Sequence, residues 1–144
     1  MESIQPLLAN ELTKQYYFHP LMKGWISIKK VLPAILSSVN SSRIITWLKD
    51  FEKGLSLYAL DDNKLIKDPY KLLPPIKLKT DEDVVEQVNE GTDAMRIYQD
   101  MMIGLNKNDI HKINEYEKAL KRYCKLDTLA MVIIWEYWMN YKEN

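Results

Sequence analysis

The stretch "RYCKLDTLAMVIIWEYW", residues 122–138, decides the fold class because its apolar side chains recur with the period of an α-helix. At 100° per residue, one face of this helix extends upstream as well. That face carries Tyr116, Leu120, Tyr123, Asp127, Met131, Ile134 and Trp138. The pattern predicts a helix that starts at Asp109 or Asn114 and continues to about Tyr141.

The opposite face of the predicted helix is basic. It carries Lys118, Lys121, Arg122 and Lys125. We interpret this face as a solvated exterior rather than a phosphate clamp, because it lies opposite the apolar stripe. After Leu126 the helix becomes apolar nearly all round, and a helix of that kind normally lies between two other layers.

Two shorter helices are predicted upstream. Residues 27–39, "SIKKVLPAILSSV", suit a helix capped by Ser27, although Pro33 should bend or break it. Residues 41–54, "SSRIITWLKDFEKG", predict a helix capped by a serine and ended by Gly54. The cap is Ser41 or Ser42, and the apolar face is formed by Ile44, Trp47, Leu48 and Phe51.

The remaining segments complete a mainly helical pattern. Helices are expected over residues 4–17, from about Thr80 or Asp81, and from Thr92 to Ile103, between Gly91 and Gly104. Residues 61–78 hold turn residues and prolines and predict an irregular connection. No segment shows convincing strand alternation. The expected fold class is therefore mainly α, an irregular helical assembly, with residues 1–144 forming a single helical domain or partial domain.

Composition narrows the function classes. Lys plus Arg equals Asp plus Glu, at 20 each, so no basic surplus indicates nucleic-acid binding. The single cysteine excludes an intrachain disulfide and a cysteine-based zinc site. Glu2 follows Met1 with no basic-to-apolar leader, and Glu136 interrupts the longest apolar run, which is about half the roughly 20 residues that cross a bilayer. We expect a cytoplasmic protein without a membrane partner.

Asp127 is the only charged residue in the apolar stripe. Burying a carboxylate is costly unless it has hydrogen-bond donors, a cation or a proton. Two roles are open for it. Asp127 can be a metal ligand, or, with Thr128, it can cap a helix that restarts there after a break.

Tyr123, Asp127 and three longer stretches of the sequence resemble known families. Tyr123 and Asp127 match the third motif, Tyr-x-x-x-Asp, of the RNase H-like proofreading exonucleases. Three ordered stretches also resemble the C-terminal part of an uncharacterised bacterial family, domain of unknown function 2779. They are "YYFHPLMKGWISIKKVLPAIL" at 16–36, "DPYKLLPPI" at 68–76, and "GTDAMRIYQDMM" through "YCKLDTLAMVIIWEYW" at 91–138.

The resemblance implies a specific chemistry. A 3'-5' exonuclease of this kind hydrolyses a phosphodiester with water between two divalent cations, and hard oxygen ligands suit Mg²⁺ or Mn²⁺. By resemblance, Asp127 would be a metal ligand and Tyr123 would orient the attacking water. The fold would correspond to the helical C-terminal portion of an RNase H-like α/β nuclease without its central sheet.

The chain departs from the family pattern where the first acidic motifs should be. Such a site needs an Asp-x-Glu on a core strand, and the one literal match, Asp50-Phe51-Glu52, falls at the polar end of a predicted helix. We interpret it as coincidence and expect no nuclease activity from this chain alone, with Mg²⁺ or Mn²⁺ held only in a completed site. His19 and His111 are interpreted as loop or surface residues, and Cys124 as a small buried thiol.

Three functions follow from these patterns. The chain can be the C-terminal fragment of the nuclease, acting with a separately encoded N-terminal half and reaching nucleic acid only through that complex. Alternatively, it is a stand-alone helical protein-interaction module or homo-oligomer, or a complete small enzyme. Without a sheet the stripe of the last helix lacks its usual cover, so we expect a homodimer or a complex with the missing half.

Overall fold

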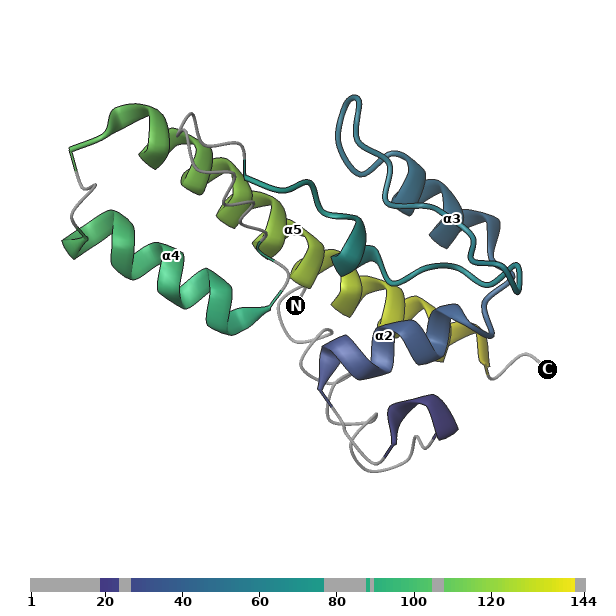
Figure 1. The fold of residues 1–144 in the computed structure, drawn as a ribbon. Coiled ribbons are helices and arrows are strands. Elements are labelled where there is room, and N and C mark those ends of the chain that lie inside the picture. Colours follow the sequence, from purple (N-terminus) through teal and green to yellow (C-terminus); the bar gives the residue numbers. More distant parts are fainter. Residues whose placement is uncertain (1–18, 24–26, 77–87, 89, 105–107, 142–144) are drawn as a thin grey trace. The chain divides into compact units, whose positions relative to one another are not determined.

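The computed structural model describes residues 19–23, 27–76, 88, 90–104 and 108–141 (Figure 1). The helical elements are η1 (Pro20–Met22), α2 (Ile28–Leu36), α3 (Ser42–Lys49), η2 (Pro69–Leu72), α4 (Gly91–Ile103) and α5 (Ile110–Tyr141). Within the described ranges there is no strand, only two isolated antiparallel bridges, Glu52–Leu55 and Leu60–Ile66. The predicted mainly α class is confirmed. The helices expected over 4–17 and from Thr80 or Asp81 lie outside the described residues.

The chain divides into two compact units, one of residues 1–69 and 127–144 and one of residues 70–126. We call them unit 1 and unit 2. The expectation of a single helical domain or partial domain over residues 1–144 stays a prediction.

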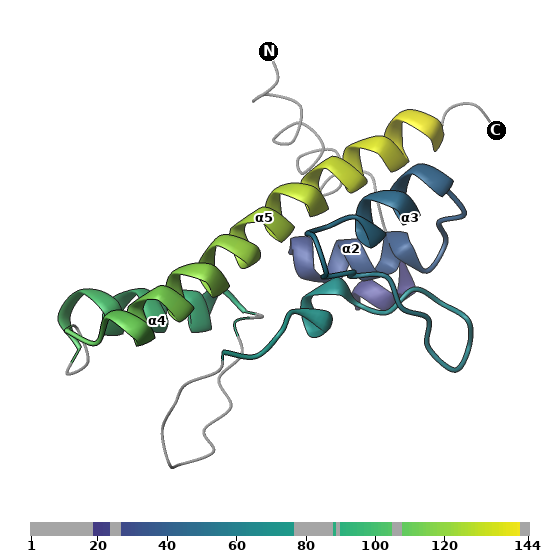
Figure 2. The same cartoon turned by 90° about the horizontal axis from the view of Figure 1, so that it is seen from above.

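Helix α5 begins where the sequence predicted. The Asp109 side chain accepts the backbone N–H of Lys112 at 3.1 Å, and its carbonyl accepts that of Ile113 at 2.9 Å. The helix then continues without interruption to Tyr141, as both views show (Figures 1 and 2). Its 32 residues correspond to a length of about 48 Å at 1.5 Å per residue. The break considered before Thr128 does not occur.

The buried face of α5 agrees with the predicted stripe but is turned slightly from it. Tyr116, Tyr123 and Ile134 are buried as expected. In the C-terminal half of α5, the fully buried residues are Leu126, Ala130 and Ile133. The other members of the predicted stripe, Leu120, Asp127, Met131 and Trp138, are only half-buried. The chain itself therefore covers much of the stripe that we expected to be uncovered.

Unit 1 is built around α2. Five of its nine residues are buried, each at most 1% exposed: Val31, Leu32, Ala34, Ile35 and Leu36. Pro33 removes one N–H from this helix, but α2 continues for three residues beyond it. Of the two expected effects, a break does not occur, and a bend stays a prediction. A proline inside a helix costs about 3 kcal/mol, and each fully buried aliphatic side chain contributes about 1.5–3 kcal/mol. The burial of α2 outweighs the defect. Ser27 lies at the N-cap position, but its side chain makes no capping hydrogen bond.

Helix α3 has the predicted cap and the predicted apolar face. The hydroxyl of Ser41 accepts the N–H of Ile44 at 3.5 Å. Ile44, Leu48 and Phe51 are buried and Trp47 is half-buried. The helix ends at Lys49 rather than at Gly54.

Gly54 instead forms a tight turn after α3. Its φ is +81°, at the third position of a turn closed by two hydrogen bonds between Glu52 and Leu55. Positive φ at that position favours glycine. Downstream, residues 61–76 form the irregular segment that the prolines predicted, with only η2 inside it. Residues 77–78 lie outside the described part.

Unit 2 joins η2, α4 and the first half of α5. Helix α4 matches its predicted range within one residue, and Gly104 donates its N–H to the Asp100 carbonyl at 3.0 Å. The side chain of Asp100 pairs with Lys112 at 3.5 Å, which joins α4 to α5. Lys112 also lies over the ring of the buried Tyr116, 5.3 Å from its centroid. Ile97 is the only buried residue of α4.

Candidate functional site

Asp127 lies in the middle of α5 and is half-buried. A residue inside a continuous helix cannot act as an N-cap, because the cap position precedes the first helical turn. The capping role is therefore wrong for Asp127. Asp127 instead lies on the side of an intact helix. The role of metal ligand stays a prediction.

Tyr123 lies one turn before Asp127 on the same helix and is a core residue of unit 2. It is 6% exposed. Its ring lies against that of Tyr70, with centroids 6.0 Å apart and planes inclined by 56°. Its hydroxyl is 3.7 Å from the position that a Cβ on Gly91 would take, so it reaches the first turn of α4. Tyr123 thus joins η2, α4 and α5. The water-orienting role inferred by resemblance stays a prediction.

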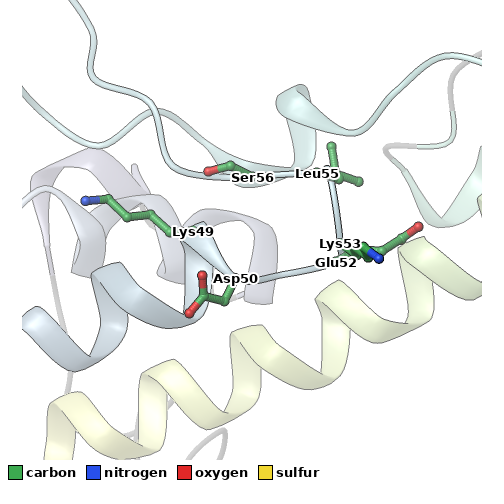
Figure 3. A pocket seen from close by; sticks show the side chains of 7 residues that line it. Lys49, Asp50, Glu52, Lys53, Leu55 and Ser56 are labelled. Atoms are coloured by element: carbon green, nitrogen blue, oxygen red, sulfur yellow. The ribbon is translucent and has the colours of Figure 1, made fainter.

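The Asp50-Phe51-Glu52 sequence does not lie on a strand. Asp50 is the C-cap of α3, and Glu52 begins the tight turn that contains Gly54. The pocket at this turn has a volume of about 390 Å³. It is lined by Lys49, Asp50, Glu52, Lys53, Gly54, Leu55 and Ser56. Figure 3 shows the side chains of Asp50 and Glu52 directed away from each other. The location agrees with our interpretation of the motif as coincidence.

The described residues do not provide a metal site by themselves. Among residues 19–23, 27–76, 88, 90–104 and 108–141, no group of three or more His, Cys, Asp or Glu side chains is placed to hold an ion.

The histidines and the cysteine lie at exposed or loop positions. His19 caps η1, because its Nδ1 accepts the N–H of Leu21 at 3.2 Å. His111 is exposed near the start of α5, so both histidines fit the loop and surface interpretation. Cys124 is exposed, and the expectation of a buried thiol is wrong. It lies on the outer side of α5, next to Tyr123 in the chain but about 100° away around the helix.

The basic face of α5 is mostly solvated, as predicted. Lys118, Lys121 and Lys125 are exposed, whereas Arg122 is half-buried. Lys118 pairs with Glu115 at 2.8 Å and Lys121 pairs with Glu117 at 2.6 Å. These hydrogen bonds from lysine lower the pKa of both glutamates. The glutamates neutralise part of the lysine charge, which weakens the case for a phosphate clamp.

A second pocket lies in unit 1, with a volume of about 410 Å³. It is lined by Ser38, Val39, Asn40, Ser41, Ile44, Tyr137 and Asn140. The lining residue Asn140 donates a hydrogen bond to Glu136 at 3.1 Å, and Arg43 donates one to the same carboxylate at 2.9 Å. Sequence reasoning missed this pocket because its lining comes from segments about 100 residues apart in the chain.

An apolar surface on α4 was also missed. Met95, Tyr98 and Met102 are 61%, 54% and 60% exposed. They lie at i, i+3 and i+7, the spacing that places side chains on one helix face. We call these three residues the α4 face. The spacing was visible in the sequence, but it is also the spacing of a core-facing stripe, so the pattern alone could not assign the face to the surface.

Comparisons with models of protein families, with curated proteins and with solved structures find no match for this chain. None of the helices in the part of the chain that the structure describes has the length and apolar character that a membrane span requires.

Proposed function

We propose that the chain is a helical portion of an RNase H-like 3'-5' exonuclease and contributes one carboxylate, Asp127, to a metal site completed by residues outside 1–144. The observation that supports this is the position of Asp127, half-buried on an unbroken helix, one turn after Tyr123. Side chains four residues apart lie on the same side of a helix, as the third motif requires. The proposal rests on the sequence resemblance for everything else.

In this proposal the chain alone does not hydrolyse nucleic acid. A two-metal site needs several carboxylates around both cations, and the described residues offer no cluster of three. The missing ligands would come from a segment that carries an Asp-x-Glu on a strand and is encoded immediately upstream of this chain. Tyr123 keeps the role that the resemblance implies for it, to orient water.

The test combines the chain with the polypeptide encoded immediately upstream of it. We expect hydrolysis of labelled DNA or RNA in the presence of Mg²⁺ or Mn²⁺ only in the mixture. Asp127→Asn should abolish it and weaken Mn²⁺ binding measured by electron paramagnetic resonance. Glu117→Gln is the matched control, because Glu117 is an exposed acid on the same helix. Tyr123→Phe distinguishes the water-orienting role of Tyr123 from its packing role. It keeps the ring packing but removes the hydroxyl, so it should lower activity more than stability. An inactive mixture, or activity that survives Asp127→Asn, would refute the proposal.

A second candidate function is a helical protein-interaction module, and the exposed α4 face supports it. Three large apolar side chains on one helix face form the kind of surface that partner proteins cover. A photo-crosslinking amino acid at position 98 should then give a discrete protein adduct in cells. The same amino acid at Met139, which is 54% exposed at the end of α5, is the control. No adduct from position 98 would refute this function.

A further inference from the structure

The α4 face carries no charge, and this limits what can bind it. Its three residues cover two turns of helix, about 10 Å along the axis. At 100° per residue, Thr92 and Gln99 flank the face on one side, and both are uncharged. The charged residues of α4, Asp93, Arg96 and Asp100, lie on the other side of the helix. Helices that bind a membrane surface carry basic residues beside their apolar face. Helix α4 has no basic residue in that position.

The order of side chains along the face is nearly symmetric. A methionine lies at each end and a tyrosine lies between them, with exposures of 61%, 54% and 60% from Met95 to Met102. If a second α4 lies antiparallel on the first, Met95 of one copy meets Met102 of the other, and the two Tyr98 rings meet at the axis. A two-fold contact requires this self-complementarity. Contacts between methionine sulfur and aromatic rings are favourable, and no like charges oppose each other across the face.

We propose that the α4 face binds the same face of a second copy of the chain, antiparallel across a two-fold axis. This inference rests on the interaction function proposed above and names its partner. It replaces the stripe of α5 as the expected dimer surface, because the chain buries much of that stripe. A face of three side chains makes a small contact compared with the roughly 800 Å² per partner of a stable interface. The dimer is therefore weak and concentration-dependent.

The first test is sedimentation velocity from about 1 to about 500 µM, a range that suits a weak interface. We expect a shift from monomer to dimer in the wild type. Met102→Asp should remove it, because two-fold symmetry introduces a buried carboxylate on each side of the contact. Met139→Asp is the matched control, since Met139 has nearly the same exposure outside the face and should leave the dimer unchanged.

The second test does not depend on the stability of the aspartate variant. In a Cys124→Ser background, which removes the native exposed thiol, Tyr98→Cys should form a disulfide-linked dimer on mild oxidation. Arg96→Cys is exposed on another side of α4 and should not. A monomer at every concentration, or a dimer that persists in Met102→Asp, would overturn the inference. So would equal cross-linking from positions 96 and 98. If position 98 then cross-linked to a different protein in cells, the interaction function would hold, but its partner would not be a second copy of the chain.

Discussion

Helices α2 and α4 have opposite relations to the core. Helix α2 buries five of its nine residues, whereas α4 buries one of thirteen. Helix α2 also contains a proline that should weaken it, and α4 contains none. Burial rather than local propensity thus decides which helix is the scaffold of its unit. Most helical stability in proteins comes from packing of this kind. A helix with one anchor and an apolar outer face suits binding better than support.

The largest difference between the two helices should appear when a buried side chain of α2 is shortened. Leu32 is fully buried, so Leu32→Ala should lower the free energy of unfolding by about 3–5 kcal/mol, from lost burial and the cavity left behind. Met95→Ala in α4 should change it by less than about 0.5 kcal/mol at low protein concentration, since exposed substitutions rarely matter more. Urea denaturation followed by circular dichroism measures both. Similar losses in the two variants would show that α4 is also scaffold.

The second largest loss of stability is expected from shortening the one buried side chain of α4. Ile97 is fully buried, and Ile97→Ala should cost about 2–3 kcal/mol, the lower part of the usual range, because a helix held at one point can close partly over the cavity. Hydrogen exchange should show the loss mainly in residues 91–103, with α2 still protected. Equal loss of protection in α2 would mean that the two helices unfold together.

A smaller effect is expected at the end of α4. A Cβ at Gly104 would collide with the side chain, carbonyl and Cα of Asp100, so Gly104→Ala should cost about 1–2 kcal/mol through overpacking. Gly91→Ala is the matched control at the other end of the helix. There a Cβ would meet only the Tyr123 hydroxyl, at 3.7 Å. Thermal unfolding should show a lower midpoint for the first variant and no decrease for the second.

The smallest effect is a pH dependence from α5. Hydrogen bonds from Lys118 and Lys121 lower the pKa of Glu115 and Glu117 in the folded state. A carboxylate with a lowered folded-state pKa stabilises the fold above its usual pKa of 4.5, and this stabilisation is lost as the pH falls below it. Both pairs are solvent-exposed, so the effect is small. Urea midpoints between pH 7 and pH 3 should fall less in a Glu115→Gln, Glu117→Gln double variant than in the wild type. Identical pH profiles would contradict this.

Local signals in the sequence predicted several helix ends well. Asp109 marked the start of α5 because its side chain can accept a first-turn N–H. Gly104 marked the end of α4 because glycine is common after the last helical residue, whereas Gly91 is the first residue of that helix. Two local signals failed. Burial of α2 outweighed Pro33, which did not break the helix, and Gly54 lies in a turn five residues after the end of α3.

The sequence by itself determined that this protein is helical, because apolar periodicity and caps act over a few residues. It also determined that Tyr123 and Asp127 lie one turn apart, since that spacing needs only a continuous helix. Tertiary structure decided which apolar faces are covered. It buried Tyr123 against Tyr70, left Asp127 half-buried, exposed Cys124 and turned the α4 face outward. The physical reason is that periodicity creates an apolar face, whereas the partner that covers it comes from segments distant in the chain.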